Sequence, residues 1–214
     1  MFRIFLRILF TILLLAAGTM YFYYGFPFPV KASHSVSLNE TDTETAELNK
    51  LKNYGGKAAL YCWQKNYNTN TCFLIDMSLP AGKNRFFVYD VKKDSILNYG
   101  LVAHGSCNYS FLETAKFSNE PGCGCSALGK YKVGYKYQGR FGMAYKLYGL
   151  DSSNSNAFER NIVLHSYYLV PDKEVNPLPI CNSLGCAMVS PNYLKVLAAK
   201  IDASKKPVLL WVFE

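Results

Sequence analysis

The chain is poor in histidine and in acidic side chains. Its 214 residues include three histidines and 15 Asp and Glu, against 23 Lys and Arg, and the formal net charge is +8. With so few imidazoles, few pairs of a nucleophile and a histidine base are available. The chain also shows no internal repeat and no aromatic-basic nucleic-acid-binding motif. The surplus of basic charge suits an anionic surface.

The N-terminus resembles an export signal. Arg3 and Arg7 precede a long uncharged stretch that is mostly apolar. Because about 20 residues span a bilayer, we interpret residues 4–26 as a retained transmembrane anchor. Small residues at Ala16-Ala17-Gly18 offer a cleavage site, so a cleaved signal peptide is the alternative. No cysteine follows these small residues, which excludes lipidation there.

The positive flank of the apolar stretch sets the expected topology. Arginines before the span place the N-terminus inside and residues 31–214 outside the cytoplasm, in the cell envelope. The membrane is then one partner, through the N-terminal helix, and no nucleic-acid partner is expected. After signal cleavage, the same residues would be secreted or periplasmic.

The sequence divides into three parts. Residues 1–30 form the signal anchor, residues 31–53 a polar and locally acidic linker, and residues 54–214 a single domain. The pair Gly55-Gly56 is expected to break the chain before a short helix over residues 57–66. One domain of this length has room for one core.

Short apolar or alternating segments between turn residues predict a mainly β domain with a few short helices. The expected strands cover residues 72–77, 85–91, 95–104, 131–137, 144–148, 161–165 and 207–213. Residues 107–142 are rich in glycine, serine and tyrosine and should be mostly loop beside a site. The clearest helix begins with Ser190 as N-cap and Pro191 at its first position, with Leu194, Leu197, Ala198 and Ile201 on one face.

A cysteine and a histidine stand out as a catalytic pair. Cys186 ends the motif Ser183-Leu184-Gly185-Cys186, and His165 ends the apolar run Asn161–His165. A free cysteine is mostly thiol at neutral pH, so a nearby imidazole matters as the group that takes the proton. Gly185 permits a tight bend, after which the amides of Gly185 and Cys186 can point at a developing oxyanion.

A series of short motifs, all in one order, resembles a known family. The family is the murein L,D-transpeptidases, in the branch described as the second L,D-transpeptidase catalytic-domain family. The motifs are Ile75-Asp76, residues 85–90, Val102-Ala103-His104-Gly105-Ser106, Phe117-Ser118-Asn119, residues 126–131, Tyr148-Gly149-Leu150, Asn156-Ala157, Arg160, Ile162-Val163-Leu164-His165 and Ser183-Leu184-Gly185-Cys186. The resemblance covers residues 74–213 and implies an L,D-transpeptidase-like β-sandwich or barrel.

The resemblance also implies a function, which is acyl transfer on peptidoglycan stem peptides. Cys186 would be the nucleophile, His165 its base, Gly185 part of the oxyanion hole and Ser183 a supporting hydroxyl. The thiolate would displace D-alanine and form a thioester, which the amine of a neighbouring stem converts into a cross-link. With water in place of the amine, the enzyme would be an L,D-carboxypeptidase. The resemblance implies no metal or organic cofactor, and it predicts that a carbapenem acylates Cys186.

The chain departs from the family pattern around this pair. Ser166 stands where the family usually has glycine, Cys181-Asn182-Ser183 where it has Gly-Arg-Ser, and Ala187 where it has proline. An arginine can hold a substrate carboxylate with two hydrogen bonds, which Asn182 cannot do. We expect His104, Ser166 and Asn182 on the substrate-binding wall. A catalytically silent wall-binding domain is the alternative from another functional class.

Seven cysteines in an oxidising compartment allow three disulfides and one free thiol. We expect Cys186 to be free and Cys62 to pair with Cys72. A further bridge near the site is expected among Cys107, Cys123, Cys125 and Cys181. Two alternatives stay open, a Cys181–Cys186 bridge and a zinc site built from four of the cysteines at 107, 123, 125, 181 and 186.

Overall fold

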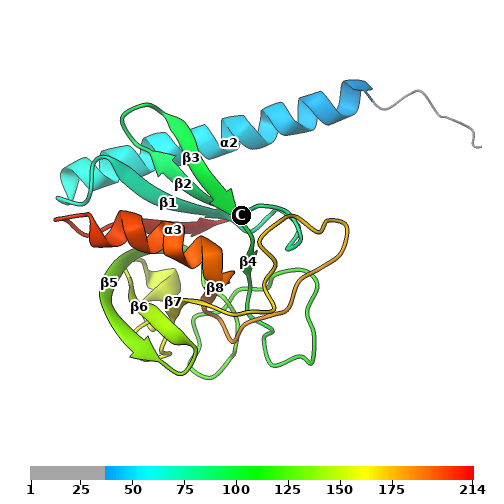
Figure 1. Ribbon diagram of the computed structural model, residues 1–214, viewed down its shortest axis with the longest axis vertical. Helices are drawn as coiled ribbons and strands as arrows, with labels where there is room; N and C mark the ends of the chain where they lie inside the picture. The colour runs from blue at the N-terminus through cyan, green and yellow to red at the C-terminus, as the bar shows by residue number, and fades with distance from the viewer. Residues whose placement is uncertain (1–36) are drawn as a thin grey trace, which may run out of the picture. The chain divides into compact units, whose positions relative to one another are not determined.

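The computed structural model describes residues 37–214 (Figure 1). The predicted anchor at residues 4–26 lies outside the described residues. Among the helices that are described, none has the length and apolar character needed to cross a membrane. The chain divides into two units, and the larger one, Thr45–Glu214, carries the sheet.

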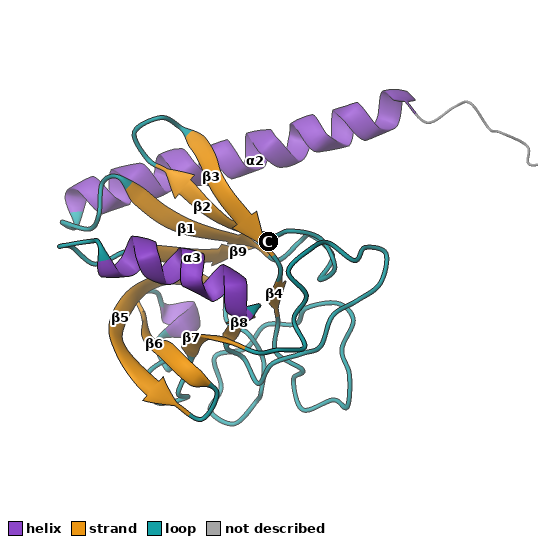
Figure 2. Cartoon of the chain, viewed as in Figure 1, coloured by secondary structure: helices purple, strands orange, loops and turns teal. Residues whose placement is uncertain are grey.

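Nine strands of the described chain form one sheet in the order β3-β2-β1-β9-β5-β6-β7-β8-β4 (Figure 2). They are β1 (Thr71–Asp76), β2 (Phe86–Asp90), β3 (Ser95–Gly100), β4 (Val102–Ala103), β5 (Gly129–Gly139), β6 (Gly142–Gly149), β7 (Val163–Ser166), β8 (Ala187–Val189) and β9 (Leu209–Phe213). Two pairs are parallel, β1 with β9 and β7 with β8. The predicted mainly β class is confirmed, and every predicted strand segment contains a strand.

The central strands are buried on both faces. Phe73 and Ile75 of β1 belong to the main core, which also contains Leu197 of α3 (Pro191–Asp202). Cys72 and Leu74 alternate with them and join a second cluster with α2 (Ser37–Gln64). Since successive side chains of a strand point to opposite faces, α2 and α3 cover opposite sides of β1. Figure 1 shows this arrangement.

Helix α2 is longer than the sequence predicts, and the expected break at Gly55-Gly56 is wrong. The helix runs without interruption through both glycines. A Cβ on Gly55 would lie 2.5 Å from the ring of Tyr89, so glycine lets the helix approach β2 closely. Leu51 and Ala58 are buried beside it. This packing offsets the cost of about 1 kcal/mol that each glycine imposes on a helix. The compact unit begins at Thr45, within α2.

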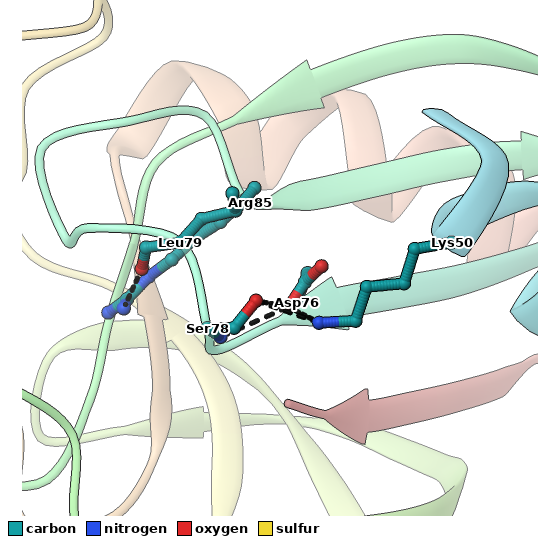
Figure 3. Close-up of polar contacts among 5 residues, drawn as sticks. All are labelled: Lys50, Asp76, Ser78, Leu79 and Arg85. Atoms are coloured by element: carbon teal, nitrogen blue, oxygen red, sulfur yellow. Dashed lines mark hydrogen bonds and ion pairs between the residues drawn. The ribbon is translucent and has the colours of Figure 1, made fainter. Parts of the chain in front are cut away.

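An ion pair ties α2 to the end of β1 (Figure 3). Lys50 Nζ lies 3.0 Å from Oδ1 of the buried Asp76. The same oxygen accepts hydrogen bonds from Ser78 N at 3.0 Å and Ser78 Oγ at 2.6 Å. In the turn that follows, Arg85 Nη1 donates to Leu79 O at 3.0 Å (Figure 3). These contacts fix the connection between β1 and β2.

Helix α3 begins where the sequence predicts. Ser190 is its N-cap, and its side chain accepts a hydrogen bond from Tyr193 N at 3.1 Å. Pro191 takes the first helical position, while Leu194 and Leu197 are buried. Because α3 follows β8 directly, its packing also anchors the segment that bears Cys186.

The described cysteines form one disulfide, Cys107–Cys125. The predicted Cys62–Cys72 bridge is wrong in this structure, since both thiols are free and buried between α2 and β1. There they behave as small apolar side chains. Burial raises both pKa values, that of Cys62 to about 12. The alternative Cys181–Cys186 bridge is not formed either.

Candidate functional site

The register of β7 and β8 brings Cys186 and His165 to one face of the sheet. In this parallel pair, His165 lies opposite Met188 and Leu164 opposite Ala187. Leu164 and Ala187 point into the main core. Because side chains alternate, Cys186, which directly precedes β8, projects to the same face as His165. The predicted base therefore lies on β7, and the predicted nucleophile lies directly before the neighbouring strand β8.

Burial favours the neutral form of the His165 imidazole. The residue is 6% exposed, and its ring stacks on Phe141 with ring centroids 5.3 Å apart. Burial lowers the pKa of His165, and a hydrogen bond to Ser166 O opposes this only in part. The Nδ1 atom lies 3.1 Å from that carbonyl, which can only accept, so Nδ1 carries the proton. Nε2 is then free to accept a proton, as a general base must.

The thiol of Cys186 is free and half-buried. Its Sγ lies 3.8 Å from Asn161 O. Burial raises its pKa, whereas a backbone hydrogen bond from Val163 and two nearby cations lower it. Among residues 43–214, no hydrogen bond joins Sγ to His165, so proton transfer needs a rotation of the thiol or a bridging group. Catalytic hydrogen bonds are often long before substrate binds.

The first of the two cations is Lys146. In the β6–β7 register it lies opposite Val163, on the face that carries His165. Its side chain is buried, and Nζ donates to Asn161 Oδ1 at 3.0 Å while lying 4.5 Å above the Phe158 ring. Burial lowers the pKa of Lys146, and Cys186 opposes that shift. Sequence reasoning missed this residue, although a lysine inside an otherwise apolar strand was a usable signal.

The second cation, Arg160, braces the loops around Cys186. Its Nη1 donates to Ser118 O at 2.8 Å, and Nη2 donates to Cys125 O and to Cys123 Sγ, the latter at 3.3 Å. A Cβ on Gly185 would lie 3.2 Å from Nη2. Arg160 thus joins three segments beside the nucleophile. It belongs to the motifs of the resemblance, but no role was predicted for it.

Gly185 and Ser183 shape the turn that precedes Cys186. Gly185 has φ +107°, a conformation that favours glycine, and its Cβ position lies 2.6 Å from Cys125 O. Its N–H donates to Ser183 Oγ at 3.1 Å, and that hydroxyl donates to Cys186 O at 2.8 Å. Ser183 is therefore a brace across the turn. The Gly185 amide that was predicted for the oxyanion hole is held by this hydroxyl.

His104 and Asn182 both contact the loop at Leu112. Arg85 Nη2 lies 2.9 Å from His104 Nδ1 and can only donate, so Nε2 carries the proton and donates to Leu112 O at 3.0 Å. Burial, together with the Arg85 cation, lowers the pKa of His104 to about 4. Asn182 accepts from Leu112 N at 2.7 Å and donates to its carbonyl at 2.8 Å. Both side chains are thus committed to the protein, and His104 is completely buried.

Aromatic rings line the site beside the histidine. Phe141 is half exposed and meets Tyr167 edge-on at 5.6 Å, and Tyr167 contacts Tyr168, which is 74% exposed. Ser166, between His165 and these tyrosines, is half-buried. Within the described residues, no group of three or more His, Cys, Asp or Glu side chains is placed to hold a metal ion.

A protein-family model described as the L,D-transpeptidase catalytic domain matches residues 45–211. The chain belongs to the L,D-transpeptidase catalytic-domain family. The match includes the strands of the site and the whole part of α2 that belongs to the compact unit. No curated protein matches the chain.

A search of solved structures finds proteins that are similar to this chain at low identity. The Ldtfm-avibactam carbamoyl enzyme is 12% identical over 68% of this chain and 49% of its own, with a TM-score of 0.42. The helical cell shape determining protein Pgp2 from Campylobacter jejuni is 14% identical over 67% and 47%, with a TM-score of 0.40. The L,D-transpeptidase from Xylanimonas cellulosilytica is 11% identical over 72% and 68%, with a TM-score of 0.37. The chain spans about half the length of the first two proteins.

Proposed function

We propose that the protein is an L,D-transpeptidase that forms a thioester on Cys186 and acts on peptidoglycan stem peptides. One observation carries this proposal. In a member of the L,D-transpeptidase catalytic-domain family, the free thiol directly before β8 and an imidazole of lowered pKa on β7 lie on one face of the sheet. A thiol nucleophile with a histidine base is the arrangement that cysteine acyl transfer requires.

In the proposed reaction, Nε2 of His165 takes the thiol proton as Sγ attacks the amide carbonyl that precedes D-alanine. The imidazolium then protonates the leaving amine, D-alanine departs, and a thioester remains on Cys186. The amine of a second stem attacks this thioester and forms the cross-link. Lys146 and Arg160 favour the thiolate, because both cations lower the pKa of Cys186 against the effect of burial.

The oxyanion formed in each step needs N–H donors. We propose the amides of Gly185 and Cys186 for this role. The Gly185 amide donates its only hydrogen to Ser183 Oγ, so it must release this hydroxyl to bind the oxyanion. Because this hydroxyl also bonds Cys186 O, it holds the two amides in one turn. Ser183 thus supports the oxyanion hole by positioning the turn.

The substrate wall is proposed on the same face. Ser166 and the aromatic rings beside His165 are accessible to a stem peptide. We propose that His104 and Asn182 affect substrate binding through the loop they hold at Leu112. We also propose that residues 31–214 act in the cell envelope, held at the membrane by residues 1–30.

Two other functions stay open on the same site. An L,D-carboxypeptidase would resolve the thioester with water. A catalytically silent wall-binding domain is the further alternative, since Asn182 is occupied by Leu112 and no arginine takes its place there.

The test is incubation of the full chain with a stem tetrapeptide, followed by mass spectrometry of the products. We expect a cross-linked dimer and free D-alanine, whereas a carboxypeptidase gives free tripeptide. Cys186→Ser should abolish turnover. The matched control is Cys181→Ser, which removes a neighbouring free thiol and should retain turnover. Full turnover by Cys186→Ser would show that the nucleophile is assigned wrongly.

A further inference from the structure

A third sulfur lies beside the disulfide of the site. Cys107 and Cys125 are bridged, whereas Cys123 is a free, half-buried thiol. The N–H of Cys125 donates to Cys123 Sγ at 3.3 Å. This contact keeps the free sulfur next to the bridged residue, and the mechanism proposed above makes no use of it.

The backbone keeps both possible partners close to Cys107. Cys107 N donates to Gly124 O at 3.1 Å, and Asn108 Nδ2 donates to Gly122 O at 3.0 Å. The segment that contains Cys123 and Cys125 therefore runs alongside Cys107. A bridge from Cys107 to either residue closes a loop of similar length.

Arg160 supplies positive charge at this cluster. Its Nη2 donates to Cys123 Sγ at 3.3 Å and also to Cys125 O. Thiol–disulfide exchange passes negative charge from the attacking sulfur to the leaving sulfur. The guanidinium contacts the Cys123 sulfur directly and therefore stabilises the attacking thiolate.

We propose that Cys107 exchanges its disulfide partner between Cys125 and Cys123. Cys123 loses its thiol proton, and its sulfur attacks Cys107 Sγ. A Cys107–Cys123 bond forms as the Cys107–Cys125 bond breaks, and the Cys125 thiolate leaves and takes up a proton. The number of disulfides is unchanged, so the step needs no oxidant or reductant.

This exchange alters contacts that position Cys186. Cys125 O packs against Gly185 at the turn before the nucleophile, and Arg160 holds both Cys125 O and Cys123 Sγ. Moving Cys123 into the bridge removes one acceptor from Arg160 and releases the Cys125 segment. The bridge partner thereby regulates acylation of Cys186, a consequence that rests on the proposed function, while the exchange itself does not.

The bridge can be assigned by mass spectrometry of the full chain. The protein is incubated at pH 7, 8 and 9, quenched with acid, alkylated and digested without reduction. One peptide contains both Cys123 and Cys125, so fragmentation must show which of them carries the alkyl group. We expect both bridges in the wild type, with at least about one part in twenty as Cys107–Cys123. Cys123→Ser should give only Cys107–Cys125. Complete alkylation of Cys123 at every pH would overturn the proposal.

Coupling to the site has a separate readout. Cys123→Ser fixes the Cys107–Cys125 bridge and Cys125→Ser fixes the Cys107–Cys123 bridge, so the two variants can be compared for acylation of Cys186 by a carbapenem. We expect rates that differ by about threefold or more. Equal rates would overturn the coupling and leave the exchange standing. Absence of acylation in both variants and in the wild type would count against the proposed function, while the bridge assignment would still decide the exchange.

Discussion

At Gly185, both the backbone conformation and the packing of neighbouring atoms disfavour a side chain. Its φ is +107°, and a Cβ would lie 2.6 Å from Cys125 O. That carbonyl is not free to move, because Arg160 donates to it. We predict that Gly185→Ala destabilises the fold and slows acylation of Cys186.

The magnitude follows from the two costs. A positive φ costs a non-glycine residue about 1–3 kcal/mol, and displacing a packed neighbour costs about 1–3 kcal/mol more. The sum is about 2–6 kcal/mol. At about 2–4 °C per kcal/mol for a domain of this size, Tm falls by about 4–24 °C. The matched control is Gly122→Ala, because Gly122 has φ +74° with no atom within 4 Å of the Cβ position. Gly122→Ala carries only the backbone cost of about 1–3 kcal/mol, without the cost of displacing a neighbour.

The assays are thermal unfolding of the folded protein and the rate of carbapenem acylation, measured on both variants. Gly185→Ala should unfold at a lower temperature than Gly122→Ala. It should also acylate at least about tenfold more slowly, since the turn that carries the nucleophile is displaced. Equal Tm values together with a wild-type acylation rate for Gly185→Ala would refute this account of the turn.

Further predictions concern His104, Arg160 and the two buried thiols. Burial lowers the pKa of His104 from 6.5 to about 4, so the folded state binds the proton more weakly than the unfolded state does. The free energy of unfolding should therefore fall by about 3 kcal/mol as the pH decreases from above 6.5 to 4. Urea unfolding at pH 7 and pH 4 should show that the free energy of unfolding falls less in His104→Asn than in the wild type. An equal fall in both proteins would contradict this prediction. Arg160→Met should slow alkylation of Cys186 by iodoacetamide at pH 8 by about three- to tenfold, because a nearby cation is worth about 1 kcal/mol to the thiolate. Arg160→Lys should retain most of the rate, and an unchanged rate in Arg160→Met would contradict the assigned effect. In the folded protein at pH 8, Cys62 and Cys72 should resist the same reagent while Cys186 reacts, because Cys62 and Cys72 are completely buried and Cys186 is partly exposed. Peptide mapping after short labelling checks this, and labelling of Cys62 as fast as Cys186 would contradict it.

Much of the fold could be predicted because its strands carry clear alternating or apolar patterns. Strand β8 was missed because its three residues are too short for a pattern to emerge. The break expected at Gly55-Gly56 is an error of another kind, because here a local pattern was present and indicated the wrong structure. Glycine there indicates a helix end by local propensity, but contact with Tyr89 favours a continuous helix, and that contact depends on the tertiary fold.

The site was predictable only in part for a related reason. Cys186 and His165 stand in recognisable motifs, but Lys146 and Arg160 reach the thiol through strand register and loop contacts that local sequence does not encode. Disulfide pairing also depends on the tertiary fold, since connectivity cannot be deduced from cysteine spacing. The bridge is Cys107–Cys125, and the predicted partner of Cys62 is a free thiol.

The central claim is that Cys186 carries the acyl group. The most direct measurement is the mass of the full chain after brief incubation with a stem tetrapeptide and an acid quench, with the modified peptide then located by fragmentation. We predict a mass increase equal to one tripeptide acyl group, located on Cys186, with D-alanine released and no adduct in Cys186→Ser. Release of D-alanine without an adduct on Cys186, or an adduct on another residue, would contradict the claim.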